Sequence, residues 1–218
     1  MTPSGKRSEQ QAPAVLREAG PADVGAIVRV HQAAFPDFLM TQLGSRFLKH
    51  YYSCALRGDD ALCLVAVDEG DVVGFAVGAI DPPAYYARLR KQRPALLLAA
   101  TGHLAVRPAV WRRTARSAAS MSNRSVGECE HGLAELASLG VVPERGGRGL
   151  GGTLVEEFVR LAAERGAGGV SLTTDAEGND AVNNFYLRHG FTRIGEGLNG
   201  TRRLNEYVRV GVSGDDPS

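Results

Sequence analysis

The stretch VPERGGRGLGGT, residues 142–153, is the part of the sequence from which the fold can be worked out. It follows an apolar run over 133–142 that predicts a buried strand, and it precedes an amphipathic helical pattern that begins at Leu150 and ends near Gly166. Glycines at such a junction let several backbone N–H groups converge at the positive end of a helix dipole. The stretch therefore predicts a site for an anion, most naturally a phosphate or pyrophosphate. The plainer alternative is a flexible turn.

The glycine spacing by itself leaves the phosphate ligand open. Residues 147–152 satisfy G-x-G-x-x-G, and Asp175 lies near the distance at which a dinucleotide-binding fold places its ribose-binding acid. However, only 43 residues follow Asp175, and residues 143–146 separate the strand from the glycines, whereas a dinucleotide-binding turn follows its strand directly. A Walker loop is excluded because no Gly-Lys-Ser/Thr occurs. A dinucleotide site therefore stays as the weaker alternative.

Apolar periodicity along the rest of the chain predicts an α/β (α+β) fold with a mixed sheet. The expected strands cover 14–19, 61–67, 72–80, 133–142, 169–174, 191–196 and 203–212, and the expected helices cover 20–35, 38–57, 150–166 and 179–189. The strand–helix–strand unit at 133–174 implies a parallel pair of strands. We expect one domain over 14–212, with flexible tails at 1–13 and 213–218.

Composition places the chain among ordinary globular proteins. It has 218 residues, of which 44% are hydrophobic and 22% charged, and these values exclude a disordered, collagen-like or disulfide-scaffold chain. Cys54, Cys63 and Cys129 are too few and too scattered to cross-link the fold, so we expect reduced thiols in a cytoplasmic protein. Residues 1–13 lack the apolar core of a signal peptide, and the uncharged stretch 94–106 is shorter than the roughly 20 residues that span a membrane. We therefore expect a soluble protein.

Charge is distributed unevenly along the chain. The formal net charge is +1, yet residues 82–127 hold nine Lys and Arg and no Asp or Glu, so the rest of the chain is strongly negative. We expect this segment to be a helical insertion between the third and fourth strands. It is either a solvated arginine-rich excursion or a basic lid that faces anionic lipid, a phosphorylated substrate or nucleic acid. Because the whole chain is nearly neutral, we expect no specific nucleic-acid partner.

Two stretches of the chain resemble the signatures of the GNAT N-acetyltransferase superfamily. Residues 142–153 look like its acetyl-CoA loop, R/Q-x-x-G-x-G/A, and residues 179–191 look like its second signature, N-x-x-A-x-x-F/L-Y-x-x-x-G-F. The resemblance covers most of 14–212 outside the basic insertion. It implies a mostly antiparallel sheet with a central parallel pair, flanked by helices, and a single acetyltransferase domain.

The chain departs from the two signatures at two positions. Gly146 stands where the loop signature has Arg or Gln, and Arg145 and Arg148 flank it. The role of that side chain is therefore unassigned here, although backbone amides can still hold a pyrophosphate. In the second signature, Val182 replaces the commoner Ala, which is a sterically mild change.

The resemblance implies that acetyl-CoA is the co-substrate and assigns residues to it. The phosphates would be held by the loop residues Gly146, Gly147, Arg148, Gly149, Leu150, Gly151, Gly152 and Thr153. The backbone of Leu139 and Val141 would hold the acetyl group and the pantetheine arm. Asn179 would hydrogen-bond the pantetheine, or else cap the last helix, which is an equally good account of an Asn at a helix start.

Two residues are implied as catalytic. Tyr186 matches the family tyrosine that serves as general acid for the leaving thiolate, and its ordinary pKa of about 10 keeps it protonated at neutral pH. The alternative is a tyrosine packed in the core. Glu135 lies in the strand before the loop, at a spacing that resembles the general-base glutamate of histone-type members. The alternative is an exposed glutamate at a strand end.

The sequence therefore predicts an N-acetyltransferase that transfers an acetyl group from acetyl-CoA directly to a primary amine of a small molecule, such as an amino sugar or another anionic acceptor. Residues 35–57 and the basic insertion would form the acceptor side. No His has metal-ligand spacing, so we expect no metal. A protein or peptide acetyltransferase, a non-catalytic CoA-binding sensor and a dinucleotide-binding enzyme remain as alternatives. A homodimer is also left open.

Overall fold

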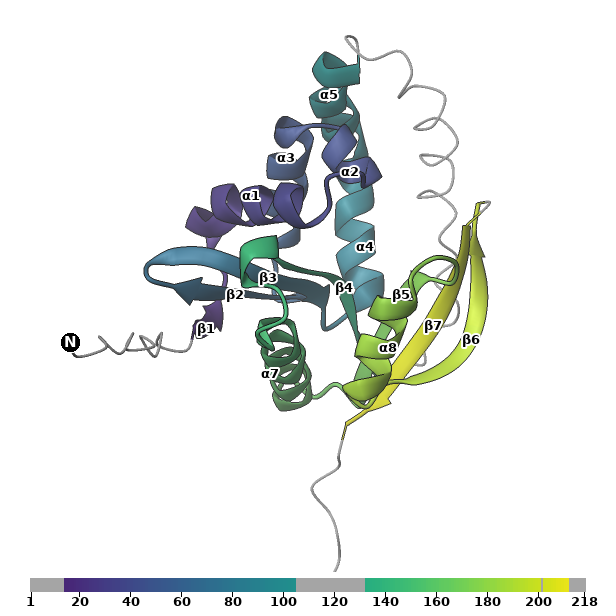
Figure 1. Cartoon of the computed structure of the whole chain (residues 1–218). Helices are drawn as coiled ribbons and strands as arrows, with labels where there is room; N and C mark the ends of the chain where they lie inside the picture. Colours follow the sequence, from purple (N-terminus) through teal and green to yellow (C-terminus); the bar gives the residue numbers. More distant parts are fainter. Residues whose placement is uncertain (1–13, 105–131, 201, 212–218) are drawn as a thin grey trace, which may run out of the picture.

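A computed structural model describes residues 14–104, 132–200 and 202–211 of the chain (Figure 1). Seven strands form one sheet in the order β1-β2-β3-β4-β5-β7-β6. The strands are β1 Val15–Glu18, β2 Ala61–Asp68, β3 Asp71–Ala79, β4 Leu133–Val141, β5 Gly169–Asp175, β6 Thr192–Asn199 and β7 Arg202–Val210. The helices are α1 Val24–Ala34, α2 Leu39–Gln42, α3 Ser45–Ala55, α4 Pro82–Lys91, α5 Arg93–Leu104, α7 Leu150–Glu164 and α8 Asp180–Arg188.

Within the described sheet, β4 and β5 form the parallel pair and every other neighbouring pair is antiparallel. The predicted mixed sheet with a central parallel pair is confirmed. A dinucleotide-binding fold needs a doubly wound, mostly parallel sheet. The observed sheet is not of that kind, so the dinucleotide interpretation of residues 147–152 is wrong.

Helices cover both faces of the sheet (Figure 1). On one face, α7 contributes Leu154 and Phe158 to a core that continues into α8 at Tyr186. On the other face, α1 and α3 contribute Ile27 and Leu48 to a second core. The central strands are therefore buried on both sides, which makes the middle of the sheet a rigid frame.

The helix expected over 38–57 is wrong as a single element. The structure has two helices there, α2 and α3, and Gly44 between them has a φ of 93°. A residue with left-handed φ cannot continue a right-handed helix. The apolar spacing of Leu39, Leu43 and Phe47 runs across the break, which is why periodicity did not reveal it. The ends of β6 and β7 also differ by a few residues from the expected strands.

The start of the basic segment is helical, as predicted, since α4 and α5 occupy residues 82–104. Residues 105–127 of the segment lie outside the described residues, as do the predicted tails. On α4, the Arg88 guanidinium binds the Asp60 carboxylate at 2.9 Å, so one of the segment's positive charges is neutralised within the fold. None of the described helices has the length and apolar character needed to cross a membrane.

A bulge interrupts β4 at Ala137. Ser138 and Leu136 pair with consecutive residues of β3, so Ala137 between them has no partner. The bulge brings β4 so close to β3 that a Cβ on Gly78 would lie 2.0 Å from the carbonyl oxygen of Glu135. Only glycine fits at position 78, because the two backbones leave no room for a side chain there.

One polar pair is buried in the core between α1 and the sheet. Nδ1 of His31 lies 2.7 Å from the hydroxyl of Tyr52 on α3. The rings of Phe35 and Phe75 flank the imidazole. His31 is only 2% exposed, and its burial lowers its pKa to about 4. The imidazole is therefore neutral at pH 7.

We predict that Gly78→Ala lowers the free energy of unfolding by about 1–3 kcal/mol, since the added methyl group overlaps backbone atoms of β4. Gly25→Ala on α1 is the matched control, because nothing lies within 4 Å of its Cβ position and Ala favours a helix over Gly by about 1 kcal/mol. Urea unfolding measures both variants. Equal effects at the two positions would contradict the close approach at the bulge.

We also predict that acid destabilises the fold through His31. The imidazole has a pKa near 6.5 in the unfolded chain and about 4 in the fold, so between these values the unfolded chain binds more protons. The free energy of unfolding therefore decreases as the pH falls from about 6.5 to about 4, by up to about 3 kcal/mol from this residue. Urea unfolding over this pH range should show a shallower pH dependence for His31→Gln. An unchanged slope would assign the effect to other groups.

Candidate functional site

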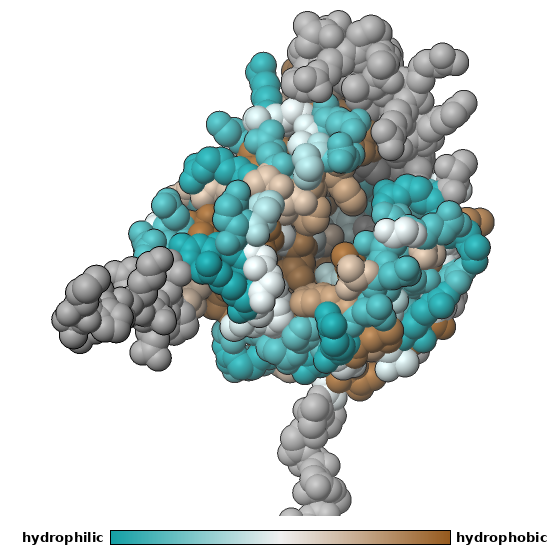
Figure 2. All heavy atoms as spheres, viewed as in Figure 1, coloured by the Kyte–Doolittle hydropathy of each residue, from teal (hydrophilic) through white to brown (hydrophobic). Residues whose placement is uncertain are grey.

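The strands β4 and β5 separate beyond Glu135. Their parallel ladder has three pairs, and the last joins Glu135 to Ser171, whereas β4 continues to Val141. Figure 2 shows a hollow between the part built from α1, β3 and β4 and the part built from α8, β6 and β7, with apolar residues at its floor. The candidate site is this gap between two strands of one sheet.

The backbone of β4 presents hydrogen-bond donors to the gap. The amide of Val142 donates to the carbonyl of Val73 on β3 at 2.9 Å, and backbone groups alternate in direction along a strand. The N–H groups of Leu139 and Val141 therefore point away from β3, toward β5. These are the two β4 residues that the family resemblance selects for the acetyl and pantetheine arm.

The glycine loop leads from the end of β4 into α7. Gly147 and Gly149 have φ values of 73° and 80°, a conformation that glycine adopts without strain. The amide of Gly146 donates to the Pro143 carbonyl, and that of Thr153 donates to the Gly149 carbonyl, both at 3.0 Å. The donors that a phosphate can use therefore lie between these two residues. They include the first amides of α7, which have no carbonyl one turn earlier in the helix.

Gly151 and Gly152 are required for a different reason than Gly147 and Gly149, because side chains of α8 lie close to them. A Cβ on Gly152 would lie 2.5 Å from the His189 ring, and a Cβ on Gly151 would lie 3.5 Å from Phe185. Both contacting side chains belong to the end of α8. Small residues in the first turn of α7 therefore let the two signature stretches approach each other closely.

The two arginines beside Gly146 differ in their surroundings. Arg145 forms an ion pair with Asp68 at 2.8 Å and lies 3.7 Å from Glu69, so its charge is directed at the β2–β3 hairpin. Arg148 is exposed on the loop. The Arg145 guanidinium is therefore used in an ion pair within the fold.

Tyr186 on α8 lies in the core at the edge of the gap. It is 8% exposed, and its ring packs against Phe185 at 5.1 Å and Phe191 at 5.6 Å. Burial raises the pKa of Tyr186 above its ordinary value, because the phenolate loses solvation there. The phenol therefore remains protonated at neutral pH. Both the packing and the acid assignments of the sequence are compatible with this position.

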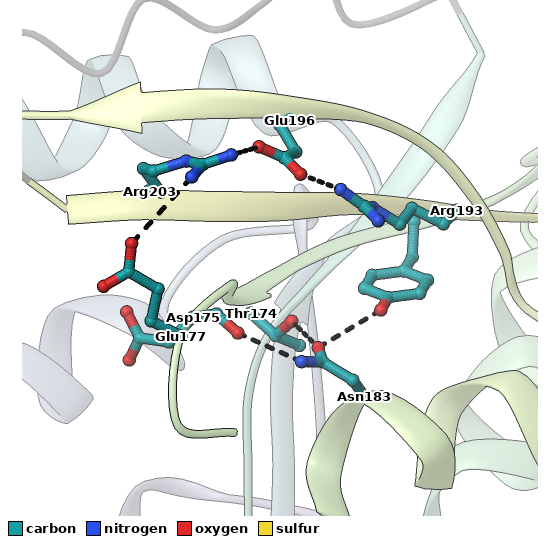
Figure 3. Close-up of polar contacts among 8 residues, drawn as sticks. Thr174, Asp175, Glu177, Asn183, Arg193, Glu196 and Arg203 are labelled. Carbon is teal, nitrogen blue, oxygen red and sulfur yellow. Dashed lines mark hydrogen bonds and ion pairs between the residues drawn. The ribbon is translucent and has the colours of Figure 1, made fainter. Parts of the chain in front are cut away.

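The buried asparagine of α8 is Asn183 rather than Asn179. Asn179 is the N-cap residue of α8, as the capping alternative predicts, but its side chain makes no cap hydrogen bond. Asn183 is 9% exposed. Its Oδ1 accepts from the Thr174 and Tyr207 hydroxyls, and its amide donates to the Asp175 carbonyl (Figure 3). This network ties α8 to β5 and β7 and thereby sets the position of Tyr186.

Glu135 is half-buried at the point where the strands separate. Its Oε1 accepts a hydrogen bond of 2.7 Å from the hydroxyl of Tyr86 on α4. The carboxylate therefore points to the sheet face that carries α3 and α4, and not into the core beneath α7. The alternative of an exposed glutamate at the strand end does not match the structure, because Glu135 is half-buried and its carboxylate contacts Tyr86.

A polar bridge joins β5 and β7 to the segment before α2. The guanidinium of Arg202, at the start of β7, binds both carboxylate oxygens of Asp175 at 2.7 and 2.6 Å. It also lies 5.6 Å from the ring centre of Phe38, just before α2. Arg202 thus connects the β5–β7 half of the sheet to the α1–α2 region. Asp175 therefore takes part in this ion pair, which no motif in the sequence indicates.

Other polar groups near the site were also not singled out from the sequence. Asn183 and Arg202 have no distinctive spacing, and the pairing of His31 with Tyr52 joins two helices 21 positions apart. Only the folded chain brings such residues together. Among the described residues, no three His, Cys, Asp or Glu side chains form a group that could hold a metal ion.

Comparisons with solved structures show the same fold. Two similar solved structures are the ribosomal-protein-S18-alanine N-acetyltransferase from Escherichia coli and the PaiA N-acetyltransferase from Thermoplasma acidophilum in complex with coenzyme A. The first has 15% identity and a TM-score of 0.56, and the match covers 94% of this chain and 99% of that one. The second has 14% identity and a TM-score of 0.55, with 89% and 98% covered. At such identities the likeness shows the fold.

The family follows from the sequence match. A comparison with curated proteins found no match. The model of the acetyltransferase (GNAT) family, however, matches residues 26–191, which include the glycine loop, both separating strands and α8. The chain therefore belongs to the GNAT family of acetyltransferases.

Proposed function

We propose that this chain transfers an acetyl group from acetyl-CoA directly to a primary amine of a small molecule. The observation that carries the proposal is the gap between β4 and β5, which continues into the glycine loop at the end of β4. One continuous site thus offers backbone donors for an extended ligand and helix-terminal amides for its phosphates. Such a site suits a thioester of coenzyme A.

The residues at the cofactor end fit this ligand. Gly147 and Gly149 have open space where a Cβ would be, so a phosphate can approach the backbone. The amides of Leu150, Gly151 and Gly152 and the dipole of α7 favour an anion at the same place. The proposed contacts are therefore made by backbone groups, which explains how the site tolerates Gly146 in place of the family's Arg or Gln.

The residues at the reacting end suit a direct transfer. Acetyl-CoA would supply the acetyl group as a thioester. Leu139 offers its N–H to the thioester oxygen, Glu135 takes the proton that the attacking amine releases, and Tyr186 gives a proton to the departing thiolate. A C–N bond forms, a C–S bond breaks, and the two protons balance. Burial supports the role of Tyr186, since it raises the pKa of the phenol and keeps the proton available.

The acceptor side supports a small amine. Arg202 joins Asp175 to the ring of Phe38, and we expect this bridge to favour a compact acceptor over an extended chain. Arg90, Lys91 and Arg93 are exposed where α4 meets α5, and they favour an acceptor with negative charge. A protein acceptor is the second candidate, because the similar Escherichia coli enzyme is named for an alanine of ribosomal protein S18.

A binding panel followed by an amine screen tests the proposal. Acetyl-CoA should raise the Tm of the protein, whereas NAD should not. Release of the CoA thiol should then depend on an added amine, first among amino sugars and other small amines and separately among peptides with free N-termini. If only peptides are acetylated, the acceptor is a protein and not a small molecule. Tight binding without turnover would identify a CoA-binding sensor.

We predict that Glu135→Gln and Tyr186→Phe each lower kcat by about 100-fold, because each removes one proton-transfer group while keeping the side-chain shape. The Kd for acetyl-CoA, measured by calorimetry, should stay within about twofold, since the phosphate contacts are unchanged. Glu164→Gln on the exposed end of α7 is the control and should keep full activity. Wild-type kcat in either active-site variant would remove that residue from the mechanism.

We further predict that Arg202→Ala raises the acceptor KM about tenfold and leaves the acetyl-CoA KM unchanged, because it removes the contact that holds Phe38. The exposed Arg160, which pairs with Glu157 on the far end of α7, provides the control variant Arg160→Ala. Initial-rate kinetics with each substrate varied in turn separates the two constants. An unchanged acceptor KM would show that the bridge is purely structural.

A further inference from the structure

Glu135 is the residue at which the β3–β4 and β4–β5 ladders meet. It pairs with Ala79 of β3 and with Ser171 of β5. A Cβ on Gly78 would lie 2.0 Å from the Glu135 carbonyl oxygen, so β3 lies directly against this part of β4. The backbone of Glu135 is therefore held from both sides, and the freedom that remains is that of its side-chain rotamers.

The Glu135 side chain is held by a residue of the basic insertion. The hydroxyl of Tyr86 on α4 donates to Oε1 of Glu135 at 2.7 Å, which is the length of a well-formed O–H···O bond. A carboxylate is planar, so a bond to one of its oxygens also restricts where the other can point. Segment 82–127, which the sequence marks by its charge, thus brings an uncharged side chain to the proposed base.

Helix α4 is held in place near both of its ends. It begins two residues after β3, where the amide of Ile80 donates to the Asp60 carbonyl at 2.8 Å. The Asp60 carboxylate binds the Arg88 guanidinium, in the last turn of α4, at 2.9 Å. Arg88 also donates to the Cys54 carbonyl on α3. The helix that carries Tyr86 is therefore fixed to β3, to α3 and to the start of β2.

The neighbouring tyrosine anchors the same part of α4 in the core. Tyr85 is fully buried, and its ring lies edge-on to that of Tyr86 at 5.3 Å. The Arg88 guanidinium lies 5.3 Å from the Tyr85 ring centre. The Tyr85 hydroxyl has no hydrogen-bond partner among the described residues. Tyr85 thus acts through its ring, whereas Tyr86 also offers its hydroxyl.

We propose that Tyr86 is a positioning residue for acetyl transfer, whose hydroxyl orients the Glu135 carboxylate toward the acceptor amine. The inference rests on the proposed function, and it gives the start of the insertion a role that does not depend on the charge of that segment. Tyr86 keeps its own proton, so the proton of the amine still passes to Glu135 and the balance of the transfer is unchanged. A base held in one orientation meets the amine in the reactive geometry more often.

Steady-state kinetics tests the positioning role. Tyr86→Phe keeps the ring and removes the hydroxyl, so we expect kcat to fall about tenfold, while both KM values and the Kd for acetyl-CoA stay within about twofold. Tyr85→Phe is the matched control and should keep wild-type kcat, because the hydroxyl that it removes makes no hydrogen bond within the described part of the chain. Wild-type kcat in Tyr86→Phe, or an equal loss in Tyr85→Phe, would overturn the proposal.

A double variant shows whether Tyr86 acts through Glu135. In the Glu135→Gln background the proposed base is absent, so adding Tyr86→Phe should lower kcat no further. If the two losses instead multiply, Tyr86 acts on the reaction by a separate route, and the positioning role is wrong.

Urea unfolding tests the bond itself without any turnover. Tyr86→Phe should lower the free energy of unfolding in the wild-type background and have a smaller effect in the Glu135→Ala background, where the hydroxyl has no carboxylate to bind. Equal effects in the two backgrounds would overturn the inference even for an active enzyme. If the wild-type protein acetylates no amine, the proposed function fails, and the unfolding comparison still decides whether Tyr86 holds Glu135.

Discussion

The separation of β4 from β5 is the constraint on which the site depends. Had the parallel ladder continued past Glu135, the amides of Leu139 and Val141 would be used within the sheet. Because the ladder stops there, the middle of a buried sheet offers donors that an extended ligand can accept. The bulge at Ala137 lies two residues beyond this point, and the Glu135 carboxylate accepts a hydrogen bond from Tyr86 on α4. Backbone geometry thus organises both ends of the proposed reaction.

A sheet that opens in its middle needs other contacts to hold its halves together. On one face, Arg209 of β7 binds Glu156 of α7 at 2.8 Å and donates to the His189 carbonyl. On the other, Arg202 joins Asp175 to the ring of Phe38. The gap is therefore held from both faces by arginines of one strand. Each arginine makes more than one contact, which gives these bridges more geometric definition than simple surface ion pairs have.

Much of the fold and part of the candidate site were predictable from local sequence. The glycine loop, the strand before it and α7 follow from residues that are adjacent in the chain, and so does Tyr186 on α8. The break at Gly44 was missed, because the apolar spacing continues across it. The family signature points to Asn179, but the buried and hydrogen-bonded asparagine is Asn183. A signature position carries no information on which asparagine becomes buried. Solvent exclusion is a property of packing and not of spacing.

The sequence by itself determined the order of elements, the anion-binding loop and the family, since each is encoded in neighbouring residues through periodicity, glycine content and helix-end chemistry. Tertiary structure alone decided which polar groups meet. Glu135 finds Tyr86 across 49 positions, and His31 finds Tyr52 across 21. The register of β4 against β3, with its bulge, likewise depends on contacts between distant segments. Such contacts form because buried polar groups need hydrogen-bond partners. Which groups are buried together depends on the packing of the whole chain.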